Sequence, residues 1–327
     1  MMRRMDFNVP VDDERWIAMT VFALGDLPPS GRIFFLAPGG GYARGYYDMA
    51  FPGHHGYSQA EHHTSQGHVV IAYDHLGVGE SCTDGLAEIT IEDIADANAK
   101  AVLSVMEQVR RGTLSDFLPA LPDALFIGAG QSMGGGVSIL MQGRHACFDA
   151  IAVLGYSAIH TVLPQRTTAE VQQGIDTYQY DRQTKGADLS VAESAAGVAD
   201  FRYPFHWEDV PPDILAADMA GGYPIRRTAP PFGSLTIPNC VVAMMSPGFV
   251  ADEAEATRVP VFLGFGERDT SVRPHQEPAA FPNSQDITLS ITPTMAHMHN
   301  FASTRHLLWN RLSAWATGLA AGSQSQE

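Results

Sequence analysis

The segment GAGQSMGGG, residues 128–136, most constrains what this chain can fold into, because it directly follows the apolar run ALFI. A glycine-rich turn after a buried strand can hold a phosphate or present a nucleophile. The dinucleotide pattern G-x-G-x-x-G requires a glycine where Met133 stands, and the phosphate loop requires a lysine that does not follow. The residues GQSMG match G-x-S-x-G, a sharp strand-to-helix turn that exposes a serine. The segment therefore predicts that Ser132 is a nucleophile.

The apolar runs along the chain predict an α/β fold with a mostly parallel central sheet and helices on both faces. Strands are expected at 15–24, 31–38, 68–74, 124–130, 150–157, 260–266 and 287–293. Helices are expected from Ile91 to a stop at Gly112, over residues 132–143, and along the face formed by Leu308, Leu312, Trp315 and Leu319. Strands that alternate with helices are typical of a parallel sheet.

The interval 158–246 breaks this alternation. It contains many prolines and polar clusters, and its aromatic residues are Tyr178, Tyr180, Phe201, Tyr203, Phe205 and Trp207. We expect residues 1–157 and 247–327 to form the core and 158–246 to form a cap (lid) inserted between two sheet strands. A long irregular surface segment is the alternative, although such segments are uncommon in compact domains.

Two later strands lead into residues that could activate the serine. A serine hydroxyl needs a base, and the base needs an acid that orients it. The strand PVFLGFG runs into Asp269, and ITLSITP runs into His297 and His299. The predicted catalytic set is Ser132, Asp269 and His297, with His299 as the alternative base and Glu267 as the alternative acid. The order Ser, Asp, His is that of the α/β hydrolases.

With these motifs the chain resembles the α/β-hydrolase superfamily over nearly its whole length. YDHLGVGES (73–81) is similar to the family's turn after its fourth strand, and LAPGGGYARGYYD (36–48) is similar to its oxyanion loop after the third. The resemblance implies an oxyanion hole formed by the backbone N–H groups of Met133 and Gly40, with Gly41 as the alternative donor. The loop departs from the family pattern at Pro38, where a histidine is usual.

The resemblance also implies a serine hydrolase with a cap, similar to zearalenone-type lactone hydrolases. We expect cleavage of a carboxylic ester or lactone with a hydrophobic or aromatic part, because the cap aromatics and neighbouring residues suit an apolar pocket. The neighbouring residues are Tyr42, Tyr46, Tyr47, Met244 and Met245. The alternatives are a C–C bond hydrolase of ring-cleavage diketones and a hydrolase-fold protein that binds a ligand without turnover. No cofactor is expected.

Composition narrows the partners and the compartment. The formal net charge of −16 would repel nucleic acid and anionic membrane surfaces. The three cysteines, Cys82, Cys147 and Cys240, are odd in number and widely spaced, so we expect buried thiols in a reducing compartment. No apolar run is long enough for a membrane span, and a cytoplasmic protein, in the form of a homodimer if it associates, is expected.

Four histidines, His54, His55, His62 and His63, invite a metal interpretation. Adjacent histidines point in different directions, and no acidic partner stands at ligand spacing. We therefore expect a solvated loop and helix face there, and no metal.

Overall fold

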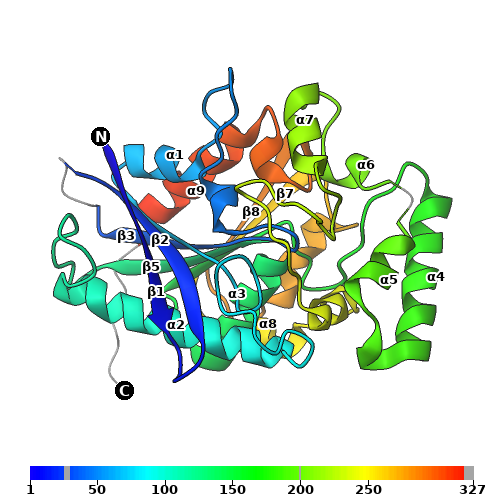
Figure 1. Cartoon of the computed structure of the whole chain (residues 1–327), viewed down its shortest axis with the longest axis horizontal. Helices are drawn as coiled ribbons and strands as arrows, with labels where there is room; N and C mark the ends of the chain where they lie inside the picture. The colour runs from blue at the N-terminus through cyan, green and yellow to red at the C-terminus, as the bar shows by residue number, and fades with distance from the viewer. Residues whose placement is uncertain (26–29, 199, 320–327) are drawn as a thin grey trace.

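The computed structural model describes residues 1–25, 30–198 and 200–319. Its centre is an eight-stranded sheet in the order β1-β2-β4-β3-β5-β6-β7-β8, shown in Figure 1. The strands are β1 (Met2–Pro10), β2 (Trp16–Leu24), β3 (Arg32–Ala37), β4 (Val69–Tyr73), β5 (Leu125–Gln131), β6 (Ala150–Leu154), β7 (Val261–Arg268) and β8 (Ile287–Ala296). Strands β3 to β8 are parallel, whereas β2 pairs antiparallel with β1 and β4. The predicted mostly parallel sheet is confirmed.

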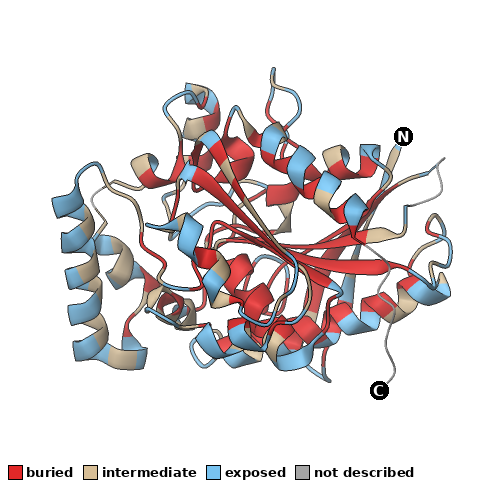
Figure 2. Ribbon diagram, turned by 180° about the vertical axis from the view of Figure 1, so that it is seen from behind, coloured by how far each residue is buried: buried red, intermediate tan, exposed pale blue. Residues whose placement is uncertain are grey.

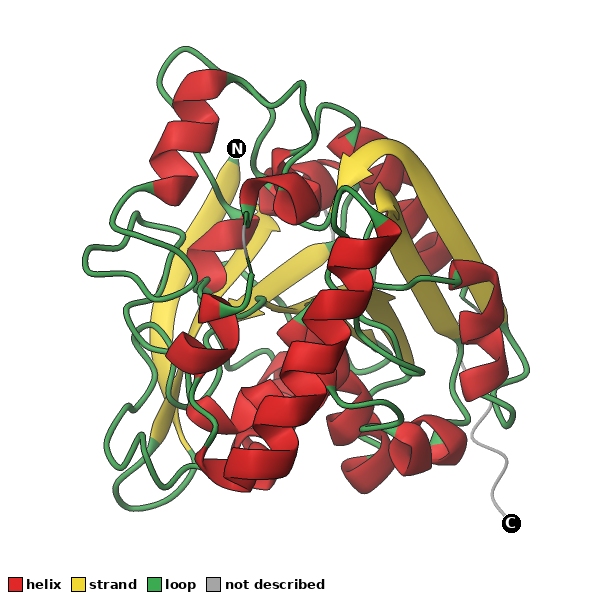
Figure 3. Ribbon diagram, turned by 90° about the vertical axis from the view of Figure 1, so that its right-hand side faces the viewer, coloured by secondary structure: helices red, strands yellow, loops and turns green. Residues whose placement is uncertain are grey.

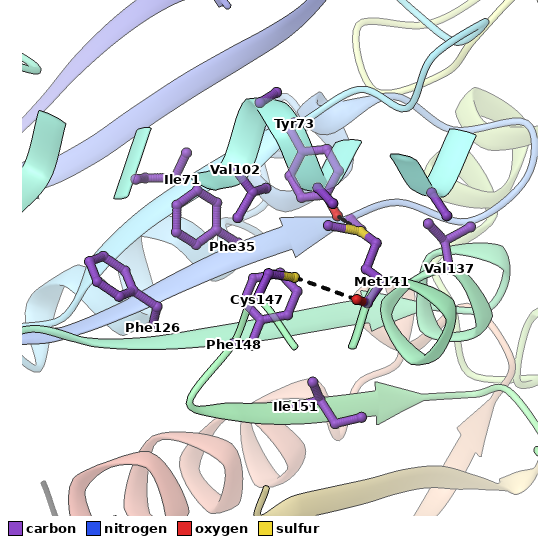
Figure 4. Packing of buried hydrophobic residues seen from close by; sticks show 14 of the residues in the cluster. Phe35, Ile71, Tyr73, Val102, Phe126, Val137, Met141, Cys147, Phe148 and Ile151 are labelled. Carbon is purple, nitrogen blue, oxygen red and sulfur yellow. Dashed lines mark hydrogen bonds between the residues drawn. The ribbon is translucent and has the colours of Figure 1, made fainter. Parts of the chain in front are cut away.

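Helices cover both faces of this sheet (Figure 1). One face packs against α2 (Ile91–Arg111), α3 (Met133–His145) and α8 (Ala251–Ala256). The other packs against α1 (Gln59–Ser65) and α9 (Arg305–Gly318). Figure 4 shows part of the hydrophobic core on the α2 and α3 side of the sheet, where Phe35, Phe126 and Phe148 pack beside the strands. Burial of such side chains stabilises the fold by about 25 cal/mol per Å² of apolar surface.

Helix α2 ends where the sequence predicts. Thr90 and Asp93 form a capping box at its start, and Gly112 ends it with a left-handed φ of 69°. The single polar residue on its apolar stripe, Asn98, is fully buried. Its amide bonds the backbone N–H of Leu76 and the ring of His75, so it fixes the turn after β4.

The segment between β6 and β7 contains short helices and, within its described residues, no strand. Its main helices are α4 (Thr168–Lys185), α5 (Val191–Ala196), α6 (Arg202–Phe205) and α7 (Pro212–Met219), with the 3-10 helices η2 (Gly186–Asp188) and η3 (Asn239–Met245). In Figure 1, α4 and α5 stand at the right-hand end of the molecule, away from α1 and β1, and Figure 3 views the molecule from that end. Helix α4 has no buried side chain, as the colours of Figure 2 show. The cap boundaries at 158 and 246 stay a prediction.

Some side-chain environments differ from the expectation. Cys82 and Cys147 are buried, but Cys240 is only half-buried, so that part of the prediction is wrong. His63 is also not solvated: it is fully buried, stacks on Phe34 and bonds the hydroxyl of Ser313. Within the described residues, no helix combines the length and hydropathy needed to cross a membrane. The polar tail at 322–327 lies outside the described residues.

Candidate active site

Ser132 stands alone between the end of β5 and the start of α3. Its backbone has φ 53° and ψ −120°, a strained conformation for a residue with a side chain. The turn is tight enough to exclude side chains at both flanking glycines. A Cβ on Gly130 would lie 2.0 Å from the carbonyl oxygen of Gly134, and one on Gly134 would lie 2.2 Å from that of Ala37. This is the geometry of a nucleophile elbow.

The structure brings the predicted base and acid to this serine. The Nε2 atom of His297 lies 2.9 Å from the Ser132 Oγ, and its Nδ1 atom lies 2.7 Å from Oδ1 of Asp269. Because an ionised carboxylate only accepts hydrogen bonds, the proton of the neutral imidazole sits on Nδ1. The Nε2 lone pair then faces the serine hydroxyl, which is the arrangement that general-base catalysis needs.

His299 bonds the acid and not the serine. Its Nε2 lies 2.7 Å from Oδ2 of Asp269, the carboxylate oxygen that does not bond His297. The backbone N–H groups of Gly266 and Thr270 also donate to this carboxylate, each at a distance of 2.8 Å. Burial alone would raise the pKa of Asp269, but the charges and hydrogen bonds of His299 and His297 hold it well below the usual range. Asp269 is thus an anion held by four donors.

The alternative acid lies elsewhere. Glu267 is exposed, and its carboxylate accepts a hydrogen bond from the backbone N–H of Thr294. Thr294 itself has a positive φ of 54°, so this bond holds β8 in a conformation that residues with side chains rarely adopt. Glu267 therefore supports the strand, and Asp269 is the carboxylate beside His297.

Two of the three candidate oxyanion donors line one cavity together with Ser132. Gly40 and Met133 are among the residues that line this cavity, and Gly41 is not. Met133 is the first residue of α3, where a backbone N–H has no acceptor within the helix. In the oxyanion loop, the carbonyl of Pro38 accepts a hydrogen bond from Nε2 of His75 at 2.9 Å. His75 therefore braces the loop at the position where the resemblance leads us to expect a different residue.

The cavity has a volume of about 300 Å³ and is walled largely by the segment 158–246. Apolar lining residues from this segment include Val171, Ile175, Phe201, Phe205, Val242 and Met244. Among its described lining residues there is no lysine or arginine. The two methionines predicted to line a pocket, Met244 and Met245, do so.

The three tyrosines predicted to line the pocket do not. Tyr42, Tyr46 and Tyr47 belong to the oxyanion loop, but their side chains are fully buried and are absent from the cavity wall. Their hydroxyls bond buried groups: that of Tyr47 donates to the carbonyl of Ala37, and that of Tyr46 accepts from the N–H of Asn300. They pack the core instead, because each hydroxyl finds a partner there.

The sequence did not predict the contacts that hold residues 297–299, the loop after β8, which we call the histidine loop. The side chain of Gln131 donates to the carbonyl of His297 at 2.9 Å. The N–H groups of His297 and Met298 donate to the carbonyls of Pro204 and Phe205, at 3.0 and 2.9 Å. Gln131 occupies a variable position of G-x-S-x-G, and the other two contacts use backbone atoms. No residue pattern in the sequence indicates these three contacts.

Neither a family model nor a curated protein sequence matches this chain. Solved structures do match it. A proline iminopeptidase from Mycobacterium smegmatis is 17% identical, with a TM-score of 0.60, over 95% of this chain and 97% of that chain. A soluble variant of monoglyceride lipase from Saccharomyces cerevisiae, in complex with a substrate analogue, is 14% identical with a TM-score of 0.63, over 95% of both chains.

A haloalkane dehalogenase loop variant from Bradyrhizobium elkanii is 13% identical with a TM-score of 0.61, over 97% of both chains. The chain therefore has the α/β-hydrolase fold. The names of these three proteins describe three different reactions, so the fold alone does not assign one. The function has to be argued from the site.

Proposed function

We propose that this protein is a serine hydrolase that cleaves a carboxylic ester or lactone of a hydrophobic substrate through an acyl-enzyme on Ser132. One observation carries the proposal: the hydrogen-bonded chain Ser132–His297–Asp269 stands at the elbow that opens into an apolar cavity. Haloalkane chemistry requires a carboxylate at the elbow, and this chain has a serine there.

The geometry supports the following sequence of steps. His297 takes the hydroxyl proton through Nε2 as the Ser132 Oγ attacks the carbonyl carbon, and Asp269 stabilises the imidazolium. The oxyanion that forms accepts hydrogen bonds from the backbone N–H groups of Met133 and Gly40. His297 then gives its proton to the leaving alkoxide, and water attacks the acyl-enzyme with the same base.

The cavity favours a substrate without negative charge. A buried carboxylate needs a cationic partner, and the described lining holds none. The side chain of Asp181 lies in the wall and would repel an anion. A neutral ester or lactone, including an aromatic macrolactone of the zearalenone type, fits this lining better than a carboxylate-bearing ring-cleavage diketone. The volume of about 300 Å³ lies at the lower end for small-molecule sites.

A fluorophosphonate probe tests the reaction class. Labelling of the folded protein at Ser132, lost in Ser132→Ala, is the expected result. A substrate panel of short esters, aromatic lactones and vinylogous diketones, read by product mass, then tests the bond that is cleaved. Folded protein that is not labelled and turns over nothing would instead be a ligand-binding protein with this fold. A cytoplasmic location and a homodimer stay predictions from the sequence.

A further inference from the structure

A buried ionic cluster begins at Tyr42 of the oxyanion loop and lies outside the cavity. The carboxylate of Asp218, which is fully buried, accepts hydrogen bonds from the hydroxyl of Tyr42 at 2.8 Å, Nε2 of His206 at 2.8 Å and Nη2 of Arg226 at 3.0 Å. We call these four residues the Asp218 cluster. Burying such charges costs several kcal/mol per ion, and well-packed apolar residues often serve stability as well. A contribution to stability is therefore a weak explanation for the presence of this cluster.

One side of the Asp218 cluster holds the oxyanion loop. The Nε of Arg226 donates to the carbonyl of Gly41 at 3.2 Å, and the hydroxyl of the nearby Tyr223 donates to the carbonyl of Gly40 at 3.2 Å. The carbonyl of Gly39 accepts from the N–H of Tyr42 at 3.1 Å. Three successive carbonyls of the loop are thus fixed.

These bonds fix the direction of the N–H groups as well. Because a peptide unit is planar, each carbonyl determines the direction of the next residue's N–H. The carbonyl of Gly39 sets the N–H of Gly40, and that of Gly41 sets the N–H of Tyr42, which in turn holds Gly39. Arg226 therefore acts on the candidate oxyanion donor through two peptide units, without reaching the cavity.

The other side of the cluster leads to the histidine loop. His206 directly follows Pro204 and Phe205, the residues whose carbonyls accept from the N–H groups of His297 and Met298. Its bond to Asp218 therefore ties the segment that holds the base to the segment that holds the oxyanion loop. The ring of Phe205 also packs against that of His297, with centroids 5.1 Å apart.

We propose that the Asp218 cluster is a positioning unit that sets the oxyanion donor and the catalytic histidine relative to Ser132. This inference rests on the proposed hydrolase function. Arg226 and Asp218 are positioning residues: they touch no substrate and act through Gly40 and the backbone of the histidine loop. Their loss should weaken binding of the transition state more than binding of the substrate.

Two variants test the proposal. Arg226→Lys keeps a charge beside Asp218 but removes the Nε donor to Gly41, and Tyr42→Phe removes only the hydroxyl that joins the oxyanion loop to Asp218. Arg32→Lys is the matched control, because Arg32 also donates to backbone carbonyls, those of Ala316 and Leu319, from the opposite end of its strand. The readouts are kcat, KM for a p-nitrophenyl ester, and the inhibition constant of a trifluoromethyl ketone, which forms an oxyanion adduct on the serine.

A misplaced catalytic group can cost on the order of 100-fold in rate. We expect Arg226→Lys to lower kcat by about 10- to 100-fold, with KM within about twofold, and to weaken the ketone by a similar factor. We expect Tyr42→Phe to show the same pattern at roughly 3- to 10-fold. Arg32→Lys should retain wild-type values.

Two results would overturn the proposal. One is an unchanged kcat and ketone affinity in folded Arg226→Lys and Tyr42→Phe. The other is a rise in KM alone, because that would assign the cluster to substrate binding. If Arg226→Lys does not fold, Tyr42→Phe still decides, since the ring of Tyr42 and its packing remain. Failure of the proposed function is separate: wild-type protein would then show neither fluorophosphonate labelling nor ester hydrolysis.

Discussion

Replacing each of the two adjacent histidines tests the assignment of the base. His299→Ala removes one of four hydrogen-bond donors to Asp269, whereas His297→Ala removes the group that contacts the serine. A hydrogen bond to a charged group contributes about 1.5–3 kcal/mol. If that whole contribution is lost in the transition state, kcat falls by about 10- to 150-fold, at about 1.4 kcal/mol for each factor of ten.

His297→Ala should cost far more, on the order of 10⁶-fold, as loss of the base does in serine hydrolases. The assay is single-turnover hydrolysis of a p-nitrophenyl ester, with circular dichroism to check folding. His299→Gln is the matched control for His299→Ala, since an amide can still donate to Asp269, and it should recover part of the rate. Equal losses in His297→Ala and His299→Ala would refute the assignment of distinct roles.

Three further predictions concern stability and the nucleophile. Gly134→Ala places a Cβ 2.2 Å from the Ala37 carbonyl oxygen, so urea unfolding should show that the free energy of unfolding falls by about 1–3 kcal/mol. Gly174→Ala in α4 is the control, because nothing lies within 4 Å of the added Cβ; its free energy of unfolding should stay unchanged or rise by up to about 1 kcal/mol. Burial lowers the pKa of His75 to about 4, so the unfolded state takes up its proton first as pH falls. The free energy of unfolding should therefore decline by roughly 3 kcal/mol between about pH 6.5 and 4, and less in His75→Gln; a flat stability profile in urea titrations would contradict this. Ser132→Ala should retain the wild-type melting temperature or exceed it, because the strained turn loses only a hydroxyl; a large loss of stability would show that the serine is structural.

The parts of the fold that the sequence predicts are those encoded by local patterns. Strands β3 to β7 contain short apolar runs because helices cover both faces of the sheet, and such runs are visible without a structure. The edge strand β1 escaped prediction, since Arg3, Arg4, Asp6 and Asn8 give it the composition of a loop. The order of Ser132, Asp269 and His297 was readable because each follows a strand whose end lies at the same sheet edge.

The rest of the site depends on contacts between residues that are far apart in the chain. The bond between the Tyr42 hydroxyl and Asp218 joins positions 176 residues apart, and Asp218 stands in no motif. The same holds for Gln131 and the carbonyl of His297. Composition could not place Tyr42, Tyr46 and Tyr47 either, because a buried tyrosine with a bonded hydroxyl and a pocket tyrosine have the same local sequence signal.

The two halves of the segment 158–246 differ in how they are held, and this difference bears on function. Helix α4 has no buried side chain and contributes Val171, Ile175 and Tyr178 to the cavity wall. Helices α6 and α7 contain Phe205 and Asp218, both buried and bonded or packed against the catalytic loops. Substitutions in α4 can therefore change the shape of the cavity without moving Ser132, His297 or Asp269. Amide hydrogen exchange should show α4 opening at a lower free energy than α7, because local stability follows burial. Equal protection of the two helices would contradict this division of the segment, in which α4 shapes the cavity and α6 and α7 hold the proposed catalytic residues in place.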